Sequence, residues 1–225
     1  MSTVVRDGDR FLTEAAGRST RHLYSFGAHY DPSRLGFAAM VAHNDETLPP
    51  GTGYADHPHS EIEIVTWVLS GALRHTDATG RSGLLLPGDV QRISAGTGIV
   101  HAEVCEPDLG PGVETRFLQT WLRPDEAART PAYGSEHGAP DGALTEVVGP
   151  AGLGVGTAGA RLSLGTPRAG ELPAAEHLHL FVVSGRFRVG GTALGPGDSL
   201  LLGETDGRSL EVLEPGPVAV WAFGV

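Results

Sequence analysis

The chain has 225 residues, with 16 arginines, no lysine and 27 aspartates and glutamates, which gives a formal net charge of −11. This acidity argues against direct binding of DNA or RNA and against a basic membrane-binding surface, because both need cationic side chains beside phosphate groups. The single cysteine excludes an internal disulfide, and no segment reaches the roughly 18 apolar residues of a membrane span. The N-terminus has no signal-peptide pattern, so we expect a soluble, cytoplasmic protein.

Short apolar runs separated by glycine and proline turns recur along the chain, and helical periodicity is scarce. This pattern is typical of an all-β sandwich or barrel. The runs that we expect to form strands are 62–69, 83–86, 117–122, 178–183, 199–202 and 218–223. We predict one helical turn at 124–129, and a linker at 133–142 that separates a first domain (1–135) from a second (136–225).

The two halves share a weak internal repeat. The sequence Val-Leu-Ser-Gly-Ala-Leu-Arg at 68–74 resembles Val-Val-Ser-Gly-Arg-Phe-Arg at 182–188. A Pro-Gly-Asp turn follows each of them, at 87–89 and 196–198. A strand, a glycine turn, a second strand and a Pro-Gly-Asp turn therefore occur twice, which indicates one β architecture that was duplicated and then diverged.

Two short motifs indicate a metal site in the first half. His57-Pro58-His59 precedes an expected strand, and His101-Ala102-Glu103 follows a glycine-rich turn. Side chains two residues apart on a strand project from the same face. If the two strands are neighbours, three imidazoles and one carboxylate converge, a donor set that suits a divalent first-row metal. By spacing alone, an ordinary surface or core position for each histidine remains an equal alternative.

These motifs also carry a resemblance to a known family. The pattern Gly51-x5-His57-x-His59-x3-Glu63-x7-Gly71 follows the first cupin motif, and Gly98-x2-His101 matches the centre of the second. The chain more specifically resembles the pirins, a family of bicupins, strongly over residues 5–130 and weakly beyond. Further matching segments lie at 20–26, 30–32, 36–37, 63–69, 74–75, 87–91, 94–103 and 118–121.

The resemblance implies two tandem cupin (jelly-roll-like) β-barrels and one metal ion per chain. The ligands that it implies are His57, His59, His101 and Glu103, and the metal is most often Fe(II), with Mn, Co, Ni, Cu or Zn as alternatives. It also implies a quercetin 2,3-dioxygenase activity, in which O2 opens a flavonol and carbon monoxide is released. We expect Glu103 to act as the catalytic base that takes the proton of the substrate hydroxyl.

A second function from another class stays open. Some pirins resemble iron-binding redox sensors that act through a protein partner, and a third alternative is a structural bicupin with an inert metal. We expect a small aromatic substrate with O2 as partners, no direct nucleic acid or membrane partner, and a monomer whose two barrels bury each other.

Four further positions bear on the site. Glu63 shares the strand parity of His59, so a role in supporting the ligands is an alternative to a plain sheet position. We expect His75 to be an ordinary sheet residue, Trp67 to be a core aromatic and Cys105 to be an inert buried thiol.

The second half contains His177-Leu178-His179, but its register relative to the repeat differs from that of the first half. Counted from the hairpin glycines, the positions of His57 and His59 fall on Glu171 and Pro173. Counted from the Pro-Gly-Asp turns, the position of His101 falls on Leu210. We therefore predict a degenerate second cupin without metal.

Overall fold

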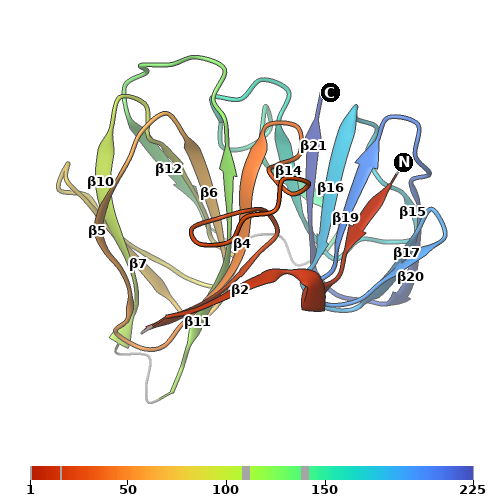
Figure 1. Ribbon diagram of the computed structural model, residues 1–225, viewed down its shortest axis with the longest axis horizontal. Coiled ribbons are helices and arrows are strands. Elements are labelled where there is room, and N and C mark those ends of the chain that lie inside the picture. The colour runs from red at the N-terminus through yellow and green to blue at the C-terminus, as the bar shows by residue number, and fades with distance from the viewer. Residues whose placement is uncertain (1, 16, 108–111, 138–141, 225) are drawn as a thin grey trace.

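Four β-sheets lie one behind another across the molecule, two in each of two barrels (Figure 1). The computed structural model describes residues 2–15, 17–107, 112–137 and 142–224. Strands dominate this part of the chain, and η1 (Asp7–Asp9) is a short 3-10 helix. The fold is all-β, as predicted, and none of the described helices has the length and apolar character needed to cross a membrane.

The first barrel consists of a seven-stranded and a four-stranded sheet. The strands of the larger sheet are, in spatial order, β12 (Ala132–Glu136), β9 (Val90–Ser94), β6 (Glu63–Ser70), β11 (Thr115–Leu122), β4 (Met40–Leu48), β3 (Arg18–His22) and β2 (Phe11–Ala15). Those of the smaller sheet are β5 (Gly53–His59), β10 (Ile99–Cys105), β7 (Leu73–Asp77) and β8 (Ser82–Leu85).

The second barrel repeats this arrangement with a six-stranded and a four-stranded sheet. The strands of the larger sheet are β1 (Thr3–Val5), β19 (Ser199–Gly203), β16 (His177–Val182), β21 (Val218–Phe223), β14 (Arg161–Gly165) and β13 (Thr145–Val148). Those of the smaller sheet are β15 (Gly170–Glu171), β20 (Ser209–Glu214), β17 (Arg186–Val189) and β18 (Thr192–Leu194). All six apolar runs expected to form strands do so.

The internal repeat is visible in both topology and local bonding. The order β9-β6-β11-β4-β3 corresponds to β19-β16-β21-β14-β13, and β5-β10-β7-β8 corresponds to β15-β20-β17-β18. The backbone N–H of Val68 donates to the carbonyl of Asp89 at 3.0 Å, and Val182 donates to Asp198 at 3.0 Å. In both turns the aspartate side chain also accepts a backbone N–H three residues earlier, at 2.8 and 3.0 Å. The two Pro-Gly-Asp turns therefore have the same hydrogen-bonding pattern in both halves.

The two large sheets face each other, and their contact forms the main apolar core. Val65, Trp67 and Leu118 of the first barrel lie in one buried cluster with Leu162 and Trp221 of the second. Burying a large apolar side chain contributes about 1.5–3 kcal/mol. Both faces of the central strands β6 and β21 are covered, which explains why these two strands are mostly apolar in sequence.

Three local predictions are wrong. Residues 125–128 form a bend rather than a helical turn, and Ala128 has a left-handed φ of 58° that a helix cannot contain. The predicted linker begins inside β12, which pairs with β9 of the first barrel. Strand β1 lies in the predicted first domain (1–135) but belongs to the second barrel, where it pairs with β19 and forms the outer strand of the larger sheet. The positions 138–141 of the predicted linker lie outside the described residues.

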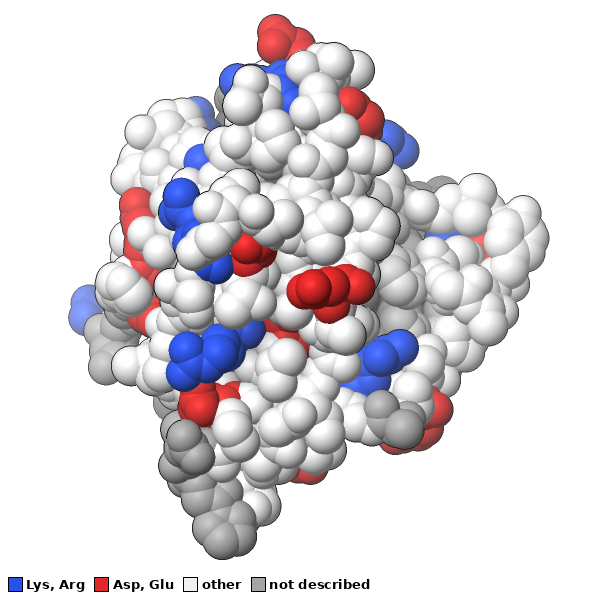
Figure 2. Space-filling model, turned by 90° about the vertical axis from the view of Figure 1, so that its left-hand side faces the viewer, with Lys and Arg blue, Asp and Glu red and all other residues white. Residues whose placement is uncertain are grey.

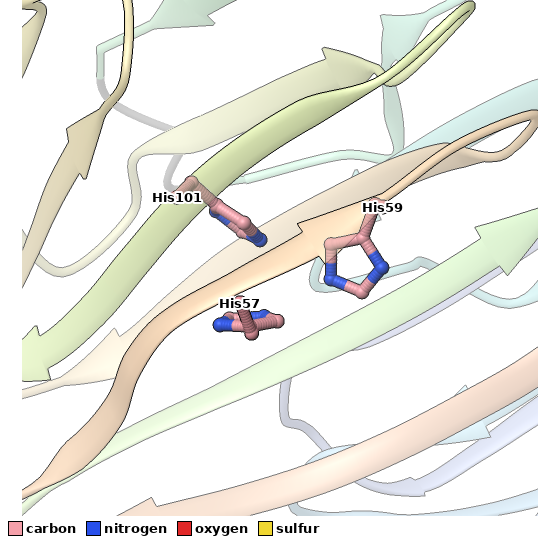
Figure 3. A group of neighbouring side chains, drawn as sticks. All are labelled: His57, His59 and His101. Carbon is pink, nitrogen blue, oxygen red and sulfur yellow. The ribbon is translucent and has the colours of Figure 1, made fainter.

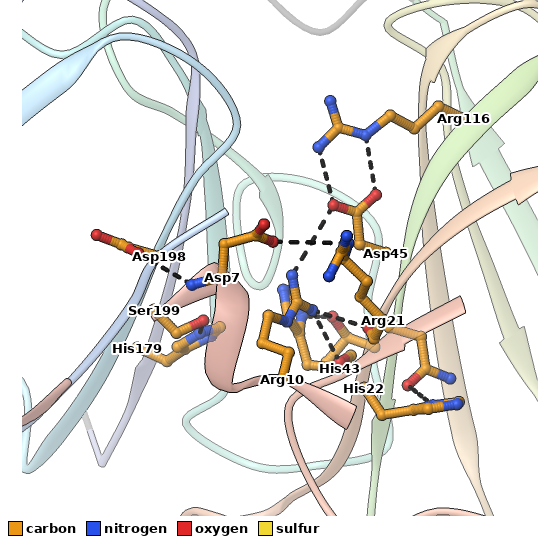
Figure 4. A network of polar contacts seen from close by, with 12 residues as sticks. Asp7, Arg10, Arg21, His22, His43, Asp45, Arg116, His179, Asp198 and Ser199 are labelled. Atoms are coloured by element: carbon orange, nitrogen blue, oxygen red, sulfur yellow. Dashed lines mark hydrogen bonds and ion pairs between the residues drawn. The ribbon is translucent and has the colours of Figure 1, made fainter. Parts of the chain in front are cut away.

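The N-terminal segment also joins the barrels through charged groups (Figure 4). The Arg6 guanidinium and the Asp7 backbone N–H both donate to the Asp198 carboxylate, at 2.7 and 3.1 Å. Arg10 follows on the first-barrel side, fully buried in its side chain, with Asp45 at 3.8 Å. Residues 6–10 thus form a polar seam along one edge of the apolar contact.

Candidate metal centre

Strands β5 and β10 pair in antiparallel fashion and bring the two sequence motifs together. His57 lies opposite His101 in the register, and His59 lies opposite Ile99. The three imidazole rings turn toward one another (Figure 3), with centroid separations of 4.5 Å for His57–His101, 4.7 Å for His57–His59 and 5.0 Å for His59–His101. One ring nitrogen of each lies within 4.8 Å of the other two. The neighbouring strands on which the predicted site depends are therefore present.

The protonation chemistry of these histidines fits a bound cation. Burial, together with the neighbouring rings, lowers the pKa of His59 to about 4 and that of His101 to about 3, so both rings are neutral at pH 7. Both nitrogens of His101 are buried without a hydrogen-bond partner among the described residues. The Nδ1–H of His57 donates to the Ala55 carbonyl at 2.8 Å, which leaves the Nε2 lone pair free. Buried, unpartnered imidazole nitrogens are the donors that a divalent first-row metal takes.

Glu103 lies on the same strand face as His101 and is buried. Its Oε1 accepts a hydrogen bond from Gln91 Nε2 at 2.6 Å, and its Oε2 accepts one from Gln119 Nε2 at 2.8 Å. Trp121 Nε1 donates to Gln119 Oε1 at 2.9 Å, which requires the amide nitrogen of Gln119 to face the carboxylate. The carboxylate of Glu103 is therefore held in a defined orientation from two sides.

The four predicted ligands do not form one tight group. His57, His59 and His101 make up one cluster, whereas Glu103 clusters with His101 and His75. His101 belongs to both clusters and links them. Three histidines thus converge, and the Glu103 carboxylate lies next to His101, the histidine that is common to both clusters.

His75 is a sheet residue of β7, as expected, and it lies beside the candidate ligands. It lies directly opposite Glu103 in the β7–β10 register, and its side chain is fully buried. Its Nε2 lies 3.3 Å from the Asp77 carboxylate, and its Nδ1 has no hydrogen-bond partner in the described part of the chain. The pattern His75-x-Asp77 on one strand, facing His101-x-Glu103 on the next, was the signal in the sequence.

The supporting role considered for Glu63 is wrong. Its strand, β6, alternates between the interior of the first barrel and the contact with the second, where Val65 and Trp67 are buried. Glu63 belongs to the second set: its Oε2 accepts the Ser94 hydroxyl at 2.7 Å, and its other oxygen lies against Gly156 of the second half. Parity counted from His59 fails because the chain turns between β5 and β6, with Glu61 at a left-handed φ of 53°.

Two expected core residues are found where predicted. Trp67 packs in the apolar contact between the barrels and does not face the histidines. Cys105 is completely buried in a cluster with Leu73 and Phe117, where the Thr115 hydroxyl donates to its sulfur at 3.0 Å. The thiol behaves as a small apolar residue.

A cavity of about 150 Å³ opens beside the candidate ligands. It is lined by His57, His59, Glu103, Gln119, Phe26, Trp121, Asn44, Glu46 and Tyr54. Phe26 and Trp121 meet edge to face at 5.2 Å, and Trp121 also packs against His59 at 4.9 Å. The cavity thus has an aromatic wall next to the histidines. Outside it, the surface of the first barrel in Figure 2 carries only scattered charged side chains.

The second barrel has a different interior. Leu210 pairs with Val189, four residues after Gly185, as Glu103 pairs with His75, four residues after Gly71. Leu210 therefore corresponds to Glu103 rather than to His101, a shift of two from the position counted along the sequence. The buried cluster around Leu210 is apolar.

The histidines of the second half lie elsewhere. His179 is buried in the contact between the barrels, where its Nε2 lies 3.1 Å from the Ser199 hydroxyl and its ring meets His43 edge-on at 4.7 Å. His177 is exposed and packs edge-on against Phe37.

Two stacked barrels of this topology, with three inward histidines and an adjacent glutamate in the first, define a bicupin with a candidate metal centre. The family model described as Pirin matches residues 5–122. This match covers more than half of the chain. The chain therefore belongs to the pirin family.

Individual relatives are similar over different lengths. A Mycobacterium tuberculosis protein provisionally named a quercetin 2,3-dioxygenase is 39% identical over 234 residues, which cover 96% of this chain and 92% of the relative. The quercetin 2,3-dioxygenase of Escherichia coli K12 is 39% identical over 114 residues, 50% of this chain and 47% of that enzyme.

Solved structures match the entire fold. The Escherichia coli protein YhhW superposes with a TM-score of 0.92 and 26% identity, covering 100% of this chain and 99% of that chain. A structure of the bacterial pirin YhhW in complex with nickel(II) gives a TM-score of 0.89 and 25% identity, with 100% coverage of both chains.

Proposed function

We propose that this pirin is a metal-dependent dioxygenase that opens the heterocyclic ring of a flavonol such as quercetin with O2 and releases carbon monoxide. The observation that carries the proposal is the set of three converging imidazoles beside a buried glutamate, next to a cavity with an aromatic side. The names of relatives at 39% identity support the same reaction class.

The residues that would hold the metal are His57, His59, His101 and Glu103. A divalent ion in this position, with Fe(II) as the expected occupant, supplies Lewis acidity that lowers the pKa of a substrate hydroxyl. The nickel complex of YhhW shows that a related pirin accepts a divalent first-row metal.

Glu103 is the residue that we assign to proton transfer. Its carboxylate is presented by the amides of Gln91 and Gln119, and it can accept the proton of a hydroxyl placed in the cavity. Phe26 and Trp121 offer faces and edges on which a flat aromatic ring can pack, and they exclude water from that side.

Anaerobic titration with quercetin, followed by admission of O2 and an assay of carbon monoxide, tests the activity. We expect stoichiometric carbon monoxide from the metal-loaded protein. Quercetin binding without carbon monoxide would favour the regulatory alternative, which a pull-down compared between the oxidised and reduced protein would then examine.

Glu103→Gln tests the assignment of the base. The variant keeps an oxygen donor and the volume of the side chain, so we expect metal binding to be largely retained and turnover to fall by about 100-fold or more, the scale of general base catalysis. Glu61→Gln, at an exposed carboxylate outside the cavity, is the matched control. Turnover of Glu103→Gln at the wild-type rate would show that another group accepts the proton.

We also infer that metal binding is confined to the first barrel. Elemental analysis of protein isolated without added metal should give about one ion per chain, and His57→Ala should lower this value sharply. About two ions per chain, one of which survives in His57→Ala, would contradict the inference.

A further inference from the structure

The cavity beside the candidate metal centre has a second polar wall, formed by β4. Asn44 and Glu46 lie two residues apart on this strand, and both line the cavity together with His57, His59 and Glu103. Neither belongs to the predicted ligand set, and both are almost completely buried, with 3% and 2% of their surface exposed.

Glu46 is a buried carboxylate that is only half satisfied by the protein. Its Oε2 accepts hydrogen bonds from the Thr20 hydroxyl at 2.5 Å and from the Tyr54 hydroxyl at 2.9 Å. Its Oε1 has no hydrogen-bond partner within the described segments. Burial raises the pKa of Glu46 to about 7. Oε1 is not one of the fully buried polar atoms without a partner, so it keeps some accessible surface, and a ligand in the cavity that Glu46 lines can donate a hydrogen bond to it.

Asn44 supplies the complementary group. Its Oδ1 accepts the Nδ1–H of His22 at 2.9 Å, and the other nitrogen of that ring lies 2.9 Å from the Thr13 hydroxyl, which fixes the ring. The amide nitrogen Nδ2 of Asn44 has no partner in the part of the chain that the structure describes. A free donor and a free acceptor therefore stand side by side on one face of β4.

Such a pair matches a hydroxyl group, which donates one hydrogen bond and accepts another. The volume of the cavity, about 150 Å³, corresponds to that of an engineered protein cavity that binds benzene. The aromatic wall of Phe26 and Trp121 favours a flat ring in this space. The enclosed part of the site thus has the dimensions and polarity for one hydroxylated aromatic ring.

We propose that Asn44 and Glu46 bind a second hydroxyl group of the aromatic substrate, so that the site selects ligands with one hydroxyl at Glu103 and another at β4. The inference rests on the proposed function for the role of the first hydroxyl. It adds that the substrates are aromatic compounds with a second hydroxyl besides the one at Glu103, and that β4 sets this specificity.

Anaerobic binding of two flavonols to the nickel-loaded protein tests the proposal. Quercetin carries hydroxyls on all of its rings, whereas 3-hydroxyflavone has the 3-hydroxyl alone. We expect the wild-type protein to bind quercetin about 10- to 100-fold more tightly, the combined range of two hydrogen bonds, one at Asn44 and one at Glu46. Equal affinity of the wild-type protein for both flavonols would overturn the proposal.

Two variants assign the preference to β4. In Glu46→Gln, the amide oxygen can keep the Thr20 and Tyr54 hydroxyl donors, but an NH2 group then faces the cavity and cannot accept a hydroxyl. We expect Glu46→Gln and Asn44→Ala each to reduce the affinity ratio by about 10-fold or more, chiefly through weaker quercetin binding. Glu14→Gln, at an exposed carboxylate on β2, should keep the wild-type ratio.

Nickel content and thermal unfolding show whether each variant is folded and loaded. If both variants are loaded and folded and keep the wild-type ratio within about twofold, the proposal is overturned. A lost preference in binding, with no carbon monoxide from either flavonol after O2 is admitted, would support the hydroxyl site while refuting ring cleavage. Carbon monoxide release, with the preference intact in both variants, would support ring cleavage while refuting the hydroxyl site.

Discussion

Asp45 is the counterion of a fully buried arginine in the seam between the barrels, which makes Asp45→Asn a sharp test of what stabilises the molecule. The Arg10 side chain is 0% exposed, and its Nη1 lies 3.8 Å from Asp45 Oδ2. Arg116 donates to both oxygens of the same carboxylate, at 2.9 and 2.8 Å, but its side chain is 36% exposed (Figure 4). The substitution therefore removes one buried and one partly solvated ion pair.

The expected loss follows from these two environments. Burial lowers the pKa of Arg10 to about 10 even with Asp45 beside it, which shows that desolvation already outweighs the attraction. At about 4 Å the attraction is roughly 4 kcal/mol for an effective dielectric constant near 20, and the exposed Arg116 pair adds under about 1 kcal/mol. Arg10 keeps the carbonyls of Arg21 and His43 as acceptors, so we expect a net destabilisation of about 3 kcal/mol.

Chemical denaturation measures this change, and a protein of this length should lose roughly 6–12 °C in Tm. Glu211→Gln, which breaks the exposed ion pair with Arg188, is the control and should change stability by less than about 1 kcal/mol. Adding Arg10→Met to Asp45→Asn should restore much of the stability, because the unpaired buried charge is then gone. A loss below about 1 kcal/mol for Asp45→Asn alone would refute the reasoning.

Three further outcomes follow from the structure. Gly71 has a φ of 73°, and an added Cβ would lie 2.5 Å from the Glu114 carbonyl oxygen, so Gly71→Ala should lower the free energy of unfolding by about 2–4 kcal/mol in denaturant unfolding. Gly80 has a φ of 86° but open space around it, so Gly80→Ala should lower it by about 1 kcal/mol. Equal losses for the two variants would refute the steric argument. Burial holds the pKa of His43 well below 6.5 and lowers the pKa of His179 to about 3. Below pH 6.5 the unfolded chain therefore binds more protons than the folded protein, and the free energy of unfolding should fall as the pH drops from 6.5 toward about 3. Between about pH 6.5 and 5.5 the expected loss is about 1 kcal/mol for each ring. Thermal unfolding across this range should show a smaller slope in His179→Asn, and an unchanged slope would contradict the assignment. Nickel at about 1,000 times its Kd should stabilise the protein by about 4 kcal/mol, and a chelator should reverse the rise in Tm; a similar rise in His57→Ala would place the ion elsewhere.

The sequence by itself determined what is local. Alternation along a strand was enough to put His57 beside His59 and His101 beside Glu103, because each pair lies within one uninterrupted strand. The Pro-Gly-Asp turns and the apolar strands were likewise predictable, because turns favour particular residue types and buried strands favour runs of apolar residues. The duplication of the barrel followed from the same local signals.

Only the tertiary structure determined which strands and side chains lie opposite one another. Glu63 has the parity of His59 in the sequence, but the intervening turn sends it to the contact with the second barrel. Glu46 reaches the cavity from β4, and His75 lies opposite Glu103 on β7, and both strands owe their places in the sheets to pairings between distant segments. Strand pairing depends on the packing of the entire chain, so the polar wall that faces the histidines could not be found by counting along it.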